Sequence, residues 1–149
     1  MQYVSTTGGD DACIFCDHLA RGDEVLYRGP TAFVLLNAFP YNTGHLMVAP
    51  QRHVAGICDL SDDERHELMD LTAESVRIVE EAMSAHGFNV GMNLGEVAGA
   101  GIPGHLHVHV VPRWGGDTNF MTTVGETKVL PEMLADTAAK LKPRFDALL

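Results

Sequence analysis

Five short apolar runs, each bounded by turn residues, are the main pattern along the chain. Their lengths and their boundaries are typical of β-strands. Gly29-Pro30 separates the first two and predicts a hairpin with a two-residue turn, while Pro50 and Pro112 end the third and the fifth. The predicted strands lie at 24–28, 31–37, 45–49, 88–93 and 105–111.

A longer amphipathic pattern between the third and fourth strands predicts a helix. Ser61 lies three residues before Glu64, which is the arrangement of a capping box. From Leu68 to Ala82, apolar and small residues recur at helical spacing with charged residues on the other face, and Gly87 predicts the end of the helix.

Two shorter helical patterns lie towards the ends of the chain. One follows Cys16 and reaches Ala20, and the other covers 131–148 with an interruption at Pro143. The order of these elements predicts an α+β fold, with a five-stranded antiparallel sheet, one long helix and a C-terminal helix.

The composition limits the size and the class of the protein. The 149 residues, 46% of them hydrophobic, suffice for a single domain, which we place at 13–149 behind a polar, flexible leader at 1–12. The formal net charge is -10, so no nucleic-acid partner is expected. A small anion would therefore need a local site of imidazoles and backbone N–H groups.

Segments that direct a chain to a membrane or out of the cell are not expected. The N-terminus has no basic start followed by an apolar run, and no apolar run is long enough to cross a membrane. Three cysteines, an odd number, argue against a disulfide framework and favour a cytoplasmic location. Of these, Cys58 stands alone and is interpreted as a core residue.

The candidate chemistry lies in the fifth strand, where His105, His107 and His109 occupy alternate positions. Alternate side chains of a strand share a face, so the three imidazoles should line one surface, about 7 Å apart. A glycine-rich loop at 95–104 precedes them and can turn backbone N–H groups towards a phosphate. Because a neutral imidazole can act as nucleophile, base or acid, the pattern indicates attack on a nucleotide phosphate.

Two other interpretations of these histidines stay open on the residues alone. They could be a chance arrangement, or they could bind a metal ion. Three histidines in line along one strand span too far for a single ion, so a metal would take only one of them.

The run from His105 to Val111 resembles the signature of the histidine triad (HIT) nucleotide-binding proteins. The similarity extends from Cys13 to about Leu134. Other matching features are Asn37, Gly44-His45, 50–53 and 93–95, and the segments 110–114 and 116–120 are similar to the branch that acts on diadenosine polyphosphates. The resemblance implies a HIT-like fold and a nucleotidyl hydrolase or phosphorylase.

The same resemblance implies roles for the four histidines. His107 would attack the α-phosphorus and form a nucleotidyl-histidine intermediate, which water or inorganic phosphate then releases. His105 and His109 would orient His107 and help to bind the phosphate. His45, on a neighbouring strand, would complete the group.

Binding roles also follow from the resemblance. Asn37 would hydrogen-bond the ribose, Leu35 would line the base pocket, and Asn93 would contact the phosphates. From the residues alone, Asn37 and Asn93 are more typical of an asparagine at a strand end or in a turn than of a binding residue. Magnesium bound to the substrate is a further expectation.

The sequence departs from the family pattern just before the triad. Many members carry a polar pair there, whereas this chain has Gly101 and Ile102, neither of which offers a side-chain hydrogen bond to a leaving group. Backbone N–H groups of Ala100, Gly101 and Ile102 remain candidates for binding the phosphates. The acid that protonates the leaving group is thus left open.

Cys13 and Cys16 form a Cys-x-x-Cys pair that can chelate zinc, although a tetrahedral site needs two more ligands. By the resemblance these would be His53 and His105. The alternative is that both cysteines are small buried hydrophobic residues.

Three functions are therefore carried forward. The first is cleavage of dinucleoside polyphosphates such as diadenosine tetraphosphate. The second is hydrolysis of nucleoside phosphoramidates, and the third is a non-catalytic nucleotide- or zinc-binding module. The resemblance also implies a homodimer, in which residues near Trp114 reach the site of the partner.

Overall fold

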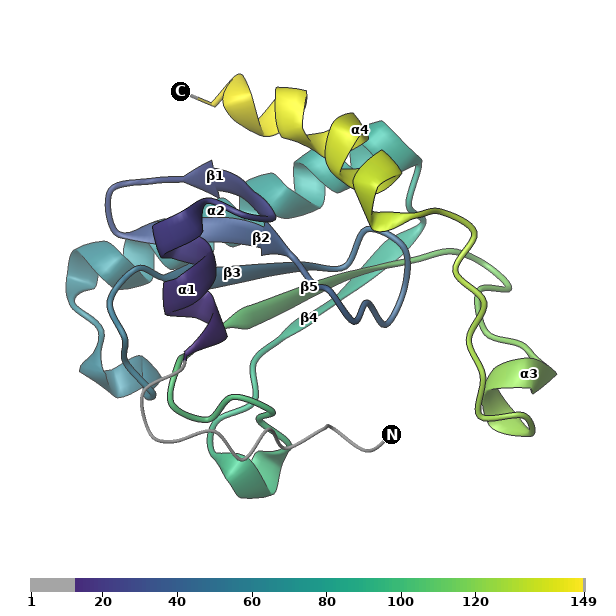
Figure 1. Ribbon diagram of the computed structural model, residues 1–149, viewed down its shortest axis with the longest axis horizontal. Coiled ribbons are helices and arrows are strands. Elements are labelled where there is room, and N and C mark those ends of the chain that lie inside the picture. Colours follow the sequence, from purple (N-terminus) through teal and green to yellow (C-terminus); the bar gives the residue numbers. More distant parts are fainter. Residues whose placement is uncertain (1–12, 149) are drawn as a thin grey trace.

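The computed structural model describes residues 13–148, so the leader expected at 1–12 lies outside them. Its centre is one five-stranded sheet in the order β1-β2-β3-β5-β4, in which all neighbours are antiparallel (Figure 1). The strands are β1 (Val25–Arg28), β2 (Ala32–Leu36), β3 (Leu46–Pro50), β4 (Gly87–Gly91) and β5 (Val108–Arg113). This confirms the predicted α+β fold.

Helices cover both faces of the sheet. The helices of the described chain are α1 (Ile14–Arg21), α2 (Asp62–Met83), α3 (Phe120–Thr123) and α4 (Leu134–Asp146), with short 3-10 turns η1 (Ile57–Asp59) and η2 (Glu96–Ala98), and α3 lies away from the sheet (Figure 1). No helix among the described residues is both long and apolar enough to span a membrane. The predicted capping box is present, because the Ser61 side chain accepts from the backbone N–H of Glu64 and the Glu64 carboxylate accepts from that of Ser61.

The two faces of the sheet bury different sets of side chains. Helices α2 and α4 pack on one face, where Val34, Val48 and Val110 belong to the main core. The opposite face lies beneath α1 and carries a smaller cluster that includes Phe15, Phe33 and Leu35 (Figure 1). Because side chains alternate along β5, His109 faces the α1 side.

The fifth strand differs from its prediction at both ends. It begins at Val108, so His105 and His107 precede it, and it continues through Pro112. Pro50 ends β3 and has no N–H to extend the ladder, and the N–H of Leu106 donates instead to the carbonyl of Val54, at 2.7 Å. Pairing between β3 and β5 ends at Val110, so Pro112 lies where β5 has a strand on one side only.

The helix ends also needed correction. Helix α2 stops at Met83, where Ser84 adopts a left-handed conformation, and the expected terminator Gly87 instead begins β4. Helix α4 continues through Pro143, held by the buried side chains of Leu141 and Phe145. Cys58, expected in the core, is exposed.

Candidate active site and metal centre

Four histidines meet on the α1 side of the sheet. The ring centroids of His107 and His109 lie 4.8 Å apart. His45 directly precedes β3, and its ring centroid lies 5.1 Å from that of His109. The ring of Phe15 on α1 lies 4.7 Å from His107 and 5.0 Å from His105. The three triad histidines therefore share a surface, as the alternation predicted, although two of them precede the strand.

The backbone fixes which nitrogen of His107 carries the proton. Its Nδ1 lies 2.8 Å from the carbonyl oxygen of His105, which can only accept a hydrogen bond. A neutral His107 therefore has its proton on Nδ1 and a lone pair on Nε2. Nε2 is the atom available as a nucleophile.

A second backbone group fixes which ring nitrogens of His45 and His109 carry the protons. The N–H of Tyr41 donates to Nδ1 of His45, at 3.0 Å, so a neutral His45 carries its proton on Nε2. That Nε2 donates to Nδ1 of His109, at 2.9 Å. His109 consequently presents an Nε2–H donor.

Burial keeps these rings neutral. It lowers the pKa of His45 to about 3, with smaller contributions from the nearby imidazoles of His109 and His107. It lowers the pKa of His109 to about 4, again with His107 adding to the effect. Burial also lowers the pKa of His107, partly offset by its hydrogen bond to His105. Near neutral pH the group thus combines an unprotonated nucleophile with a neutral hydrogen-bond donor.

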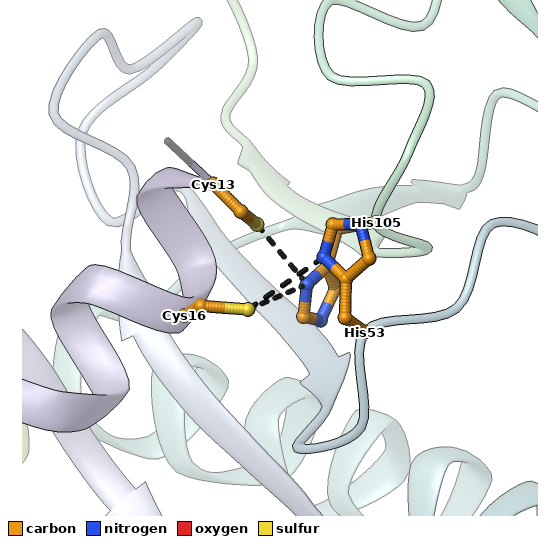
Figure 2. A group of neighbouring side chains, drawn as sticks. All are labelled: Cys13, Cys16, His53 and His105. Atoms are coloured by element: carbon orange, nitrogen blue, oxygen red, sulfur yellow. Dashed lines mark hydrogen bonds between the residues drawn. The ribbon is translucent and has the colours of Figure 1, made fainter. Parts of the chain in front are cut away.

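Cys13, Cys16, His53 and His105 come together beside this group (Figure 2). Their ligand atoms all lie within 4.8 Å of one another. The Sγ of Cys13 is 3.2 Å from Nδ1 of His105, and the Sγ of Cys16 is 3.6 Å from Nδ1 of His53 and 3.7 Å from that of His105. Cys16 lies on α1 and Cys13 directly precedes it, so the cluster joins α1 to the loop after β3 and to the triad.

This donor set fits a tetrahedral zinc ion. Zinc–sulfur and zinc–nitrogen bond lengths place neighbouring ligand atoms about 3.3–3.8 Å apart, close to the distances found here. Nε2 of His105 lies 2.8 Å from the carbonyl of Pro50 and must donate to it, which leaves the Nδ1 lone pair facing the two sulfurs. Burial and the neighbouring Cys13 thiol raise the pKa of Cys16 to about 11. Two adjacent thiolates repel each other, and a bound cation would offset that repulsion.

The expected nucleotide-binding residues have more varied surroundings. Leu35 is 1% exposed in the smaller cluster that contains Phe15. Asn37 is also buried, with its Nδ2 at 3.4 Å from both ring nitrogens of His45, and its Oδ1 accepts from the N–H of Phe39.

In the glycine-rich loop, Nδ2 of Asn93 donates to the carbonyl of Gly99, at 3.4 Å. The N–H of Ala100 donates to the carbonyl of Gly95, so it is already used within the loop. Ile102 packs against the smaller cluster, and Gly101 is exposed.

Sequence reasoning missed two side chains that touch the histidines. Phe15, between the two cysteines, contacts His105 and His107. Tyr41 stacks on His109, with ring centroids 5.6 Å apart and an interplanar angle of 22°. The position of Phe15 inside the Cys-x-x-Cys pair was a usable signal, whereas Tyr41 lies in a turn whose packing the sequence does not reveal.

An imidazole of fixed tautomer in a group of histidines on an antiparallel sheet is the arrangement that the resemblance to the histidine triad proteins implies. The HIT domain pattern matches residues 20–116, and the chain belongs to this family. Among its relatives is the protein named AP-4-A phosphorylase from Mycobacterium tuberculosis, which is 52% identical over 113 residues. That match covers 76% of this chain and 58% of the relative.

Further relatives and solved structures agree with this assignment. A bis(5'-nucleosyl)-tetraphosphatase from Schizosaccharomyces pombe is 35% identical over 92 residues, covering 62% of this chain and 50% of that protein. The chain thus spans only about half the length of these two relatives. The crystal structure of a zinc-bound histidine triad family protein from Mycobacterium smegmatis superposes with a TM-score of 0.74 at 25% identity, covering 94% of this chain and 97% of that one.

Proposed function

We propose that the protein cleaves dinucleoside polyphosphates by transferring a nucleotidyl group to His107. The observation that carries this proposal is the pair of fixed tautomers, with a lone pair on Nε2 of His107 and a proton on Nε2 of the adjacent His109. In the first step a bond forms between that Nε2 lone pair and the α-phosphorus, and the bond to the leaving polyphosphate breaks. In the second step an acceptor oxygen attacks the same phosphorus and frees His107.

The other histidines act through position and charge. The Nε2–H of His109 donates to the phosphoryl group, with His45 holding that ring. His105 supports His107 through its carbonyl. Leu35 and Asn37 serve the base and the ribose, as the family resemblance implies.

The phosphates face the glycine-rich loop in this proposal. The Asn93 amide and the N–H groups of Gly101 and Ile102 bind them. The N–H of Ala100 contributes less, because it already donates to Gly95.

The leaving group distinguishes this proposal from a phosphoramidate hydrolase. A departing amine needs a proton, and neither Gly101 nor Ile102 has a side chain to supply one. The low pKa of His109, about 4, means that few His109 rings carry an additional proton at neutral pH. A polyphosphate leaves readily without protonation, so this site favours it over an amine.

For the acceptor we propose inorganic phosphate, supported by the name of the mycobacterial relative, AP-4-A phosphorylase. Diadenosine tetraphosphate would then give ATP in the first step and ADP in the second. Water in place of phosphate would give ATP and AMP.

Product analysis with and without inorganic phosphate tests this assignment. Purified protein is incubated with diadenosine tetraphosphate, and the nucleotides are separated by anion-exchange chromatography. We expect ADP to appear only when phosphate is added. AMP and ATP in both reactions would refute phosphorolysis while leaving nucleotidyl transfer intact, and no cleavage at all would refute the proposed function.

We also propose a structural zinc ion at Cys13, Cys16, His53 and His105. The ligand spacing supports it, as does the zinc-bound relative from Mycobacterium smegmatis. When bound, zinc supplies a fixed anchor for α1 and for the His105 ring. Magnesium is proposed to enter bound to the polyphosphate substrate.

The protein is further proposed to act as a cytoplasmic homodimer. Edge strand β4 supports the association, since Val90 is 47% exposed there and one side of the strand has no sheet partner among the described residues. Residues near Trp114 are proposed to reach the site of the partner, while the indole Nε1–H of Trp114 itself donates to the carbonyls of Met83 and Ser84 in its own chain. Sedimentation as a monomer at micromolar concentration would refute the dimer.

A further inference from the structure

A cavity of about 650 Å³ lies on the same sheet face as the triad, but beyond it along β5. Val111 and Asn89, a cross-strand pair of β5 and β4, line it at the sheet. Tyr41 lines one side, and Thr118 and Lys128 from the segment after β5 line another. None of the histidines borders this space, so the proposed nucleotidyl transfer leaves it without a role.

The cavity lies too far along the strand to belong to the nucleotide that His107 attacks. Alternate residues of a strand are about 7 Å apart, so Val111 lies about 14 Å from His107. The Tyr41 ring connects the two regions, because it stacks on His109 and also borders the cavity. A ligand that spans both regions must therefore be longer than one nucleotide, and a dinucleoside polyphosphate meets that requirement.

The polar groups of the cavity suit a nucleoside carrying phosphate. Asn89 offers its amide N–H groups, since its Oδ1 already accepts from Arg113, whereas the Thr118 hydroxyl group is engaged with Arg113 and Asp117. Arg113 is already engaged, since it donates to both carboxylate oxygens of Asp117 and to Oδ1 of Asn89. Lys128 forms no ion pair with any described residue and donates only to the carbonyl of Asp117, at 3.3 Å, so its charge is available to an anion.

We propose that this cavity receives the distal nucleoside of a dinucleoside tetraphosphate, with the Lys128 ammonium group on its phosphate. This inference rests on the proposed function and names the part of the substrate that His107 does not touch. The volume lies within the range of about 300–1,000 Å³ usual for small-molecule sites. In a chain of net charge -10, the Lys128 ammonium group is a local attraction for a polyanion. The carboxylate of Glu126 also lines the cavity, so the phosphate is expected on the Lys128 side of it.

The test compares a long and a short substrate that share the first chemical step. Diadenosine tetraphosphate reaches the cavity, whereas the p-nitrophenyl ester of AMP presents the same α-phosphorus with a small leaving group. We expect Lys128→Gln to lower kcat/KM for the tetraphosphate about tenfold, the loss of one charged hydrogen bond, and to change that for the ester less than twofold. Lys142→Gln, on the far side of the sheet in α4, is the matched control and should change neither.

Binding of a non-cleavable, methylene-bridged analogue of diadenosine tetraphosphate gives a readout independent of turnover. Calorimetry should show weaker binding to Lys128→Gln and unchanged binding of AMP. The proposal is overturned if Lys128→Gln lowers kcat/KM equally for both substrates, lowers it for neither, or raises only the KM for inorganic phosphate. If the wild type cleaves no substrate, the proposed function fails, and analogue binding alone then decides for or against the cavity.

Discussion

Removal of the Cys/His cluster is the perturbation whose effect the structure predicts in most detail. Cys16→Ser deletes one of four ligands whose atoms lie within 4.8 Å of one another, so the proposed zinc should be lost. A ligand present at a thousand times its Kd stabilises a fold by about 4 kcal/mol. For a domain of this length that corresponds to a fall in Tm of roughly 8–16 °C.

The domain should nevertheless remain folded. The main core between the sheet and helices α2 and α4 contains no residue of the cluster. What loosens is α1, which begins directly after Cys13 and carries Phe15 against the ring of His107. The backbone carbonyl of His105 accepts the Nδ1–H of His107, so loosening His105 also loosens the proposed nucleophile. Turnover should therefore fall by about 10- to 100-fold, as for other residues that orient a reactive group.

Differential scanning fluorimetry with and without a chelator measures the first effect, and metal analysis measures zinc per chain. Cys58→Ser is the matched control, because Cys58 is an exposed thiol outside the cluster. The reasoning is refuted if Cys16→Ser keeps the Tm and activity of the wild type, or if the wild-type protein contains no zinc and does not respond to the chelator.

Three further predictions concern stability. In the folded protein the pKa of His45 is lowered to about 3 and that of His109 to about 4, whereas an unfolded histidine has a pKa of about 6.5. As the pH falls below about 6.5, these two histidines therefore bind protons in the unfolded chain but not yet in the folded protein. The free energy of unfolding is therefore highest above about pH 6.5 and falls below it, by about 2 kcal/mol per histidine at pH 5. Urea titrations across pH 4–8 would measure this fall, and an unfolding free energy independent of pH would contradict the buried neutral rings. Glu67→Ala should cost about 1–3 kcal/mol in the same titration, since its carboxylate accepts the N–H groups of Thr31 and Ala32 at the hairpin, and an unchanged urea midpoint would disprove that role. Ser84→Gly should raise the unfolding free energy by about 1 kcal/mol, because Ser84 has a φ of 52° where glycine has no penalty; a lower Tm would count against this.

Local patterns predicted most of the fold, while contacts between distant segments corrected it. The capping box at Ser61 was readable because both of its partners lie within one turn of helix. The start of β5 was not readable, because it depends on Leu106 donating to Val54, far away in the sequence. Likewise, helix α4 continues through Pro143 since Leu141 and Phe145 are buried against other elements.

The candidate site divides in a similar way. The alternation of histidines predicted that His107 and His109 would share a face, and their rings do meet. The protonation pattern of the site could not be predicted, because it depends on the backbone N–H of Tyr41 meeting His45. A turn residue such as Tyr41 has no periodicity from which that contact follows.

The central claim is that Nε2 of His107 forms a covalent bond to the nucleotide. The most direct test is to mix the protein with diadenosine tetraphosphate, without phosphate, quench within milliseconds to seconds, and locate the adduct by peptide mass spectrometry. We predict adenylate on the peptide that contains His107, its disappearance on adding phosphate, and neither adduct nor turnover in His107→Ala. Full activity of His107→Ala, or an adduct on any other residue, would contradict the claim.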